Sequence, residues 1–198
     1  MTQYRSPKQR ITSQLTVMVL SALVLAGCST RQIVTELEGS TAQRLVTFSI
    51  DKFIKDLADL PEIKALKGKT VHLGVHFLKD HQLLGYTTRL LNAELQIIHE
   101  IKIADAGEPA DFDLDVFFNS MGTDNDTFGL SIPTLGFVTT PDATIDILAL
   151  DMFHGITEGY AIVQDDAGSI VKTDRVLARI RRDNVSTPII NFPLNQLD

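Results

Sequence analysis

The chain mixes segments with helical hydrophobic spacing and segments in which apolar and polar residues alternate one by one. Between Ser40 and Pro61, apolar side chains recur at helical intervals, and residues 83–99 repeat this spacing. Both segments predict amphipathic helices. Residues 70–78, which lie between them, alternate with a period of two and predict a half-buried strand. The short apolar stretch 101–103 predicts another strand, so that strand, helix and strand follow in order.

The second half of the chain predicts mainly strands. Residues 111–118 alternate strictly, residues 145–151 and 156–164 are rich in β-branched and apolar residues, and residues 169–182 alternate again. Residues 165–168 read as a hairpin turn, and tight turns between successive strands favour antiparallel pairing. The predicted fold is α+β, with a mostly antiparallel sheet of about five to six strands. Two amphipathic helices pack on one face, and one strand–helix–strand unit is included.

Two segments between these strands have a weaker pattern. Residues 119–127 are rich in glycine, aspartate and asparagine, which predicts a tight connection. Residues 128–138 are apolar but contain Gly129, Pro133 and Gly136, so we expect no central strand there. The segment is then either a hydrophobic lid over the sheet edge or an exposed apolar surface that binds a partner. The candidate partner-binding residues are Phe128, Leu130, Leu135 and Phe137.

The amino-terminal residues have the pattern of an export signal. Arg5, Lys8 and Arg10 precede an apolar run that ends in the small residues Ala26 and Gly27. The uninterrupted apolar core is about ten residues long, whereas a helix needs about 20 to span a membrane. We therefore expect a cleaved secretory signal rather than a transmembrane helix.

The end of this signal, Leu25-Ala26-Gly27-Cys28, resembles the lipobox of bacterial lipoproteins. Cys28 is the only cysteine in the chain. The resemblance implies cleavage after residue 27, so that residues 1–27 are a lipoprotein signal peptide, and a lipid attached to the Cys28 thiol. Ser29 stands where an aspartate often retains such proteins in the inner membrane. The resemblance therefore favours a cell-envelope protein anchored on the periplasmic face of the outer membrane.

The residues after Cys28 predict a tether followed by one domain. Residues 28–40 are polar and end in Gly39-Ser40, which is typical of a flexible linker. Fully extended, such a segment reaches at most roughly 40 Å. We expect residues 41–198 to form a single α+β globular domain.

Composition narrows the classes of partner. The chain has 18 basic and 25 acidic residues and a net charge of −7, and removing the signal removes basic residues only. No basic cluster is present, which argues against nucleic acid as a partner and against electrostatic attraction to anionic lipid. With Cys28 lipidated, the chain has no thiol left for a disulfide or a thiolate metal site.

Histidine and aspartate residues suggest metal sites at first sight. His72 and His76 lie four apart on a predicted strand, about 13 Å from one another, which is too far to share a zinc ion. Asp111, Asp113 and Asp115 share one strand face, but neighbours on that face are nearly 7 Å apart, too far for all three to chelate one ion. We therefore expect no metal and no cofactor.

The sequence contains no G-x-S-x-G, H-E-x-x-H or P-loop motif. His154 lies near Asp151 and Glu158 in the sequence, which would suit a base with carboxylates. The same residues are equally well explained as polar positions on strands. The sequence therefore favours a protein that is not an enzyme, without catalytic residues.

Three short motifs in the body of the chain, residues 40–45, 49–52 and 66–71, are similar to a family of bacterial envelope lipoproteins with no assigned role. The similarity covers about residues 40–182 and implies no catalytic residue. Our hypothesis is a lipid-anchored binding or scaffold domain that contacts the membrane through Cys28 and a protein partner in the envelope. The alternatives are an envelope enzyme, or a carrier of an apolar ligand. The phenylalanines expected to line the carrier's pocket are Phe112, Phe117, Phe118, Phe128 and Phe137.

Overall fold

The computed structural model describes residues 30–34, 39–78, 82–133, 144–187 and 189–195. Contacts between these residues divide them into two compact units, which we describe separately. The described part of unit 1 consists of residues 30–32, 126–133, 144–152, 183–187 and 189–195. The described part of unit 2 consists of residues 33–34, 39–78, 82–125 and 153–182. Three continuous segments, residues 112–133, 144–165 and 176–186, each contribute residues to both units.

The described residues contain three helices and eight strands. The helices are α2 (Ser40–Ala58), α3 (Pro61–Lys64) and α4 (Gln82–Ile97). The first four strands are β1 (Thr30–Val34), β2 (Thr70–Phe77), β3 (Lys102–Ile103) and β4 (Phe112–Pro133). The others are β5 (Thr144–Asp165), β6 (Ile170–Lys172), β7 (Val176–Ser186) and β8 (Asn191–Pro193). The helices and strands predicted at residues 40–61, 70–78, 83–99 and 101–103 are confirmed within about two residues, the usual uncertainty of element ends.

The α+β class is confirmed, but the prediction of a mostly antiparallel sheet is wrong, because the sheet is mixed. β2 pairs in parallel with both β3 and β4, whereas β5 with β6 and β7 with β8 are antiparallel. Hydrogen-bonded neighbours follow the order β3-β2-β4-β5-β7-β8, with β1 paired to β4 and β6 paired to β5. The cause is the predicted strand–helix–strand unit: α4 returns the chain so that β3 is parallel to β2. The chain after β3 then crosses back and places β4, again parallel, on the other side of β2.

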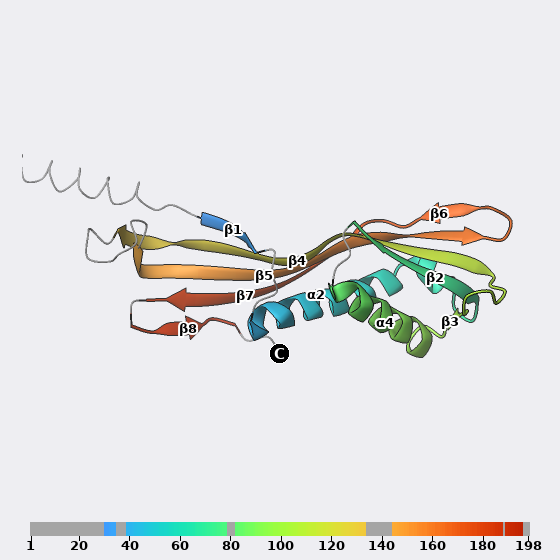
Figure 1. The fold of residues 1–198 in the computed structure, drawn as a ribbon, viewed down its shortest axis with the longest axis horizontal. Helices are drawn as coiled ribbons and strands as arrows, with labels where there is room; N and C mark the ends of the chain where they lie inside the picture. The colour runs from blue at the N-terminus through green and yellow to red at the C-terminus, as the bar shows by residue number, and fades with distance from the viewer. Residues whose placement is uncertain (1–29, 35–38, 79–81, 134–143, 188, 196–198) are drawn as a thin grey trace, which may run out of the picture. The chain divides into compact units, whose positions relative to one another are not determined.

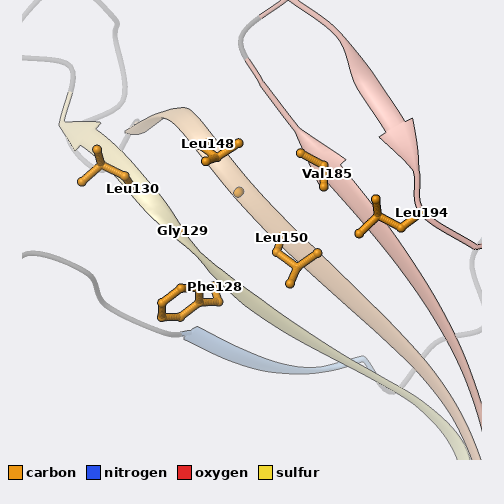
Figure 2. Close-up of a pocket in the computed structure, with 8 residues that line it drawn as sticks. Phe128, Gly129, Leu130, Leu148, Leu150, Val185 and Leu194 are labelled. Atoms are coloured by element: carbon orange, nitrogen blue, oxygen red, sulfur yellow. The ribbon is translucent and has the colours of Figure 1, made fainter.

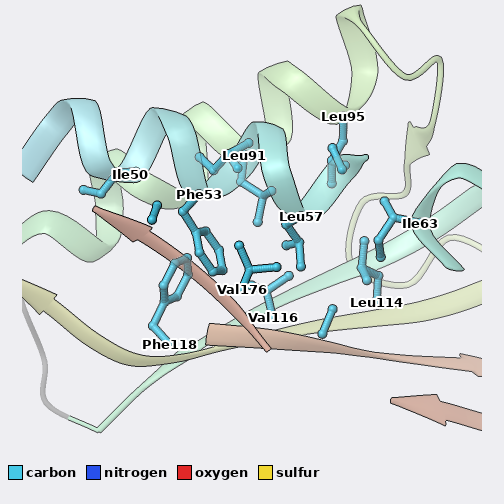
Figure 3. Close-up of a cluster of buried hydrophobic side chains, with 14 of the residues drawn as sticks. Ile50, Phe53, Leu57, Ile63, Leu91, Leu95, Leu114, Val116, Phe118 and Val176 are labelled. Atoms are coloured by element: carbon cyan, nitrogen blue, oxygen red, sulfur yellow. The ribbon is translucent and has the colours of Figure 1, made fainter. Parts of the chain in front are cut away.

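Unit 2 has a core between its helices and its strands. Figure 1 shows α2 and α4 on the same side of the strands, and Figure 3 shows their apolar side chains directed at that sheet face. The Phe53 ring of α2 is fully buried and packs on Phe118 of β4 with ring centroids 4.9 Å apart. Val71 of β2 is also fully buried, as the alternation of residues 70–78 predicts.

Helix α2 lies very close to β5 within unit 2. A Cβ atom on Gly155 would lie 2.0 Å from the carbonyl oxygen of Leu45, so only glycine allows this approach. Beside this contact the buried hydroxyls of Ser49 and Thr157 share a hydrogen bond of 2.8 Å. Backbone proximity and a satisfied polar pair thus fix α2 on the strand.

The structure differs from the sequence prediction most clearly along β4. Residues 119–127, predicted as a tight connection, continue the strand and bury Met121 and Thr123. Residues 128–133, for which no central strand was expected, complete it. Side-chain packing and pairing outweigh local turn preference in strands. Pro133 is the last residue of β4, where its missing N–H removes no interior hydrogen bond.

Candidate functional site

The described residues of unit 1 form an apolar groove of about 460 Å³. Figure 2 shows its side chains on three neighbouring strands and on the segment that follows β8. Every lining residue is glycine or carries a hydrocarbon side chain, so no polar side chain enters the groove. The lining residues are Phe128, Gly129, Leu130, Leu148, Ala149, Leu150, Val185 and Leu194.

Strand alternation places the larger groove side chains on one face of the unit 1 sheet. Phe128 and Leu130 lie two apart on β4, and Leu148 and Leu150 lie two apart on β5. Successive strand residues point to opposite faces, so each pair shares a face. Alternation places Thr127 and Asp151, which lie beside these positions, on the other face. Gly129 and Ala149 lie between them and still line the groove, because they have no side chain or only a methyl group.

The opposite face carries a polar cluster centred on Asp151. The Thr127 hydroxyl donates to one carboxylate oxygen of Asp151 at 2.9 Å, and the Ser186 hydroxyl donates to the other at 2.7 Å. These side chains come from β4, β5 and β7 and are partly buried. Asp151, considered above as a catalytic carboxylate, therefore joins the three strands that carry the groove.

Gly129 allows β4 and β5 to approach closely beneath the groove. A Cβ atom at this position would lie 2.5 Å from the carbonyl oxygen of Leu148 and 2.7 Å from the Cα atom of Ala149. Both contacts are with backbone, which has no flexible end to move aside. The glycine that argued against a strand is thus required by this pairing of strands.

The groove is open to solvent. Phe128 is 61% exposed, Leu148 is 55% exposed and Leu194 is 62% exposed. Ile189, Ile190 and Phe192, from the same unit, are also exposed. A group of large exposed apolar residues of this kind marks an interaction surface.

The sequence located part of this groove. Phe128 and Leu130, predicted as partner-binding residues, line it, whereas Leu135 and Phe137 lie outside the described residues. Leu148, Val185 and Leu194 were missed because each belongs to a different segment. A sequence signal was available on β5, since residues 147–150 are four consecutive apolar residues, which the strict alternation of a half-buried strand does not give.

The phenylalanines proposed to line a ligand pocket do not gather in the described structure. Phe118 packs on Phe53 in the unit 2 core, and Phe117 stacks on Tyr160 with ring centroids 5.4 Å apart. Of the five phenylalanines, Phe128 lines the groove and Phe137 lies outside the described residues.

A row of histidine–aspartate pairs crosses β2 and β4 in unit 2. Nδ1 of His72 lies 3.2 Å from the Asp113 carboxylate, and Nε2 of His76 lies 2.6 Å from the Asp115 carboxylate. All four side chains are well exposed. Within the part of the chain that the structure describes, no three histidine, cysteine or acidic residues are placed to hold a metal ion. The exposure of the four side chains places the row on the solvent face, where it forms a cross-strand contact between β2 and β4.

An aromatic row continues from this polar row. The His76 ring stacks on Phe117 with centroids 4.6 Å apart, and Phe117 stacks in turn on Tyr160. The Lys172 ammonium lies 4.1 Å from the centre of the Tyr160 ring. Side chains from β2, β4, β5 and β6 thus contact one another in sequence, which stabilises the strand order of unit 2.

The other residues considered for catalysis also have structural surroundings. His154 is buried, and Glu158 forms an ion pair of 3.0 Å with Arg175. Asp151 joins strands, as described above. Each of these three side chains therefore takes part in packing or in a polar contact within its own unit.

Cys28 and the signal at residues 1–27 lie outside the described residues. No helix within the described ranges is both long enough and apolar enough to cross a membrane.

Neither a protein-family model nor a curated protein sequence matches the chain.

Proposed function

We propose that this protein is a lipid-anchored binding protein of the bacterial cell envelope, and that it contacts an apolar partner through the groove of unit 1. The lipobox-like sequence ending at Cys28 supports the anchor. Ser29 supports the periplasmic face of an outer membrane. In this proposal the protein is an assembly or scaffold component rather than an enzyme.

The observation that carries the binding role is the chemistry of the groove. Ligand and active sites combine apolar walls with a few convergent polar groups. The groove walls contain only glycine and hydrocarbon side chains, while strand alternation places the polar cluster around Asp151 on the other sheet face. Such a surface suits burial of an apolar group rather than orientation of a reacting one.

A carrier of a small apolar ligand is the second candidate, and the volume of the groove favours it. About 460 Å³ falls within the range of roughly 300–1,000 Å³ that small-molecule sites occupy. A carrier should enclose most of its ligand. The high exposure of Phe128, Leu148 and Leu194 instead favours contact with a larger surface.

Metabolic labelling tests the anchor. Cells that express the protein are grown with an alkyne analogue of palmitate, and the purified protein is assayed for the label. We expect label on the wild type and on Ser29→Ala, and none on Cys28→Ser. Equal labelling of Cys28→Ser and the wild type would show that the anchor is not at this cysteine.

Co-purification tests the groove. Leu148→Asp places a charge in the groove, and Leu177→Asp is the matched control, because Leu177 is an equally exposed leucine of unit 2. We expect lipids or proteins that co-purify from solubilised envelopes with the wild type and Leu177→Asp to be lost from Leu148→Asp. A stoichiometric small apolar molecule would favour the carrier. Identical material with all three proteins would exclude the groove as the binding site.

A further inference from the structure

We infer that the apolar partner of the unit 1 groove is the lipid bilayer itself, so that Phe128, Leu148 and Leu194 insert among the acyl chains beside the anchor. This inference rests on the proposed lipid anchor at Cys28. It concerns the hydrocarbon of the membrane and not a protein partner.

The chain between the anchor and unit 1 is very short. Ser29 alone separates Cys28 from Thr30, the first residue of β1. β1 pairs with β4, and residues 30–32 belong to unit 1. Two extended peptide steps reach roughly 7 Å, far less than the tether of roughly 40 Å expected from the sequence. A lipid on Cys28 therefore holds unit 1 at the membrane surface.

The groove has the chemistry that hydrocarbon chains require. Acyl chains need no hydrogen-bonding partner, and the groove provides none. Phe192 lies two residues before Leu194 and is also exposed, which extends the apolar surface along β8. The anchor's own acyl chains are an unsuitable occupant, since they must enter the bilayer to hold the protein there. The neighbouring lipids remain as the source of hydrocarbon.

The described residues of unit 1 carry little positive charge. They contain one basic residue, Arg31, and four acidic residues, all of them aspartates. Coulomb attraction to anionic lipid therefore contributes little through this unit. Contact with the membrane must be hydrophobic, and it should depend little on salt or on lipid headgroup charge.

Fluorescence quenching in vesicles tests the inference. The chain contains no tryptophan, so Phe128→Trp or Leu194→Trp each provides a single reporter. The lipidated full chain is reconstituted into phosphatidylethanolamine–phosphatidylglycerol vesicles whose acyl chains carry bromine. We expect bromines near the headgroup to quench more than bromines at the chain end, because interfacial side chains insert roughly 5–10 Å. The matched control is Asn184→Trp, which strand alternation places on the opposite sheet face and which should be quenched less.

The possible results distinguish failure of the groove contact from failure of the lipid anchor. If mass spectrometry finds lipid on Cys28 but neither groove reporter is quenched, the inference is wrong and the anchor stands; a protein partner or a second copy then covers the groove. If Cys28 carries no lipid, both proposals fail. Quenching that disappears at high salt or in vesicles of phosphatidylethanolamine alone would contradict a hydrophobic contact.

Discussion

The apolar face of the sheet is buried in unit 2 and exposed in unit 1. In unit 2 the apolar face of the sheet is covered by α2 and α4, and Phe53 and Val116 are fully buried (Figure 3). In unit 1 the described residues include no helix, and Phe128 and Leu148 remain mostly exposed (Figure 2). β4 and β5 each supply residues to both units, so the contrast does not arise because the units are built from different strands. The difference lies in what covers the sheet: two helices cover it in unit 2, and no helix among the described residues covers it in unit 1.

The polar faces of the two units show a smaller contrast. In unit 1, Asp151 receives two hydrogen bonds from partly buried hydroxyls on neighbouring strands. In unit 2, the pairs of His72 with Asp113 and His76 with Asp115 are exposed. Hydrogen bonds in a partly buried cluster contribute more to stability than exposed histidine–aspartate contacts, which compete with water.

The largest expected difference in stability is between alanine substitutions of Phe53, in unit 2, and of Phe128, in unit 1. Phe53→Ala should lower the free energy of unfolding by about 3–5 kcal/mol, because it leaves a cavity in a closed core. Phe128→Ala should change it by no more than about 0.5 kcal/mol in the purified protein, since the side chain is mostly exposed. Urea unfolding measures both. Equal losses would show that unit 1 buries Phe128 in a core of its own.

An intermediate effect is expected at Asp151. Asp151→Ala removes the shared acceptor of Thr127 and Ser186 and should cost about 1–3 kcal/mol. Asp151→Asn keeps one acceptor oxygen and should cost less. Asp113→Ala, at an exposed pair, serves as the control. The idea of a strand-joining carboxylate fails if all three variants have the same urea midpoint as the wild type.

The smallest effect should come from the pair His76 and Asp115. A double-mutant cycle with His76→Ala and Asp115→Ala should give a coupling of about 0.2–1 kcal/mol, because both side chains are exposed. Raising the salt concentration should reduce the coupling. A coupling well above this range would mean that the solvent face of unit 2 is energetically as important as the Asp151 cluster.

Periodic patterns predicted much of unit 2. Helical spacing located α2 and α4, alternation located β2, and Gly168 marked the turn before β6, where its backbone N–H donates to the Asp165 carbonyl. These elements can be predicted from the sequence because each is a single continuous segment that buries one of its faces. The parallel pairing of β4 with β2 was not predicted, since strand direction depends on a crossover between distant segments.

Unit 1 was much harder to predict. Its residues come from separated parts of the chain, and Gly129 and Pro133 suggest a break in a strand. Only pairing with other strands shows that Gly129 permits a close approach and that Pro133 ends the strand. The groove includes Leu194, which no local pattern connects with Phe128. The lipid anchor at Cys28 stays a prediction from sequence.

Hydrogen–deuterium exchange tests most directly the claim that unit 1, unlike unit 2, needs cover from the membrane. The lipidated full chain is compared in vesicles and in mild detergent. We predict slower exchange in vesicles for residues 144–152 and 183–187, because the membrane covers their exposed apolar face. Exchange of the core strand residues 112–118 should be the same in vesicles and in detergent. Equal exchange of residues 144–152 in vesicles and detergent would contradict the account.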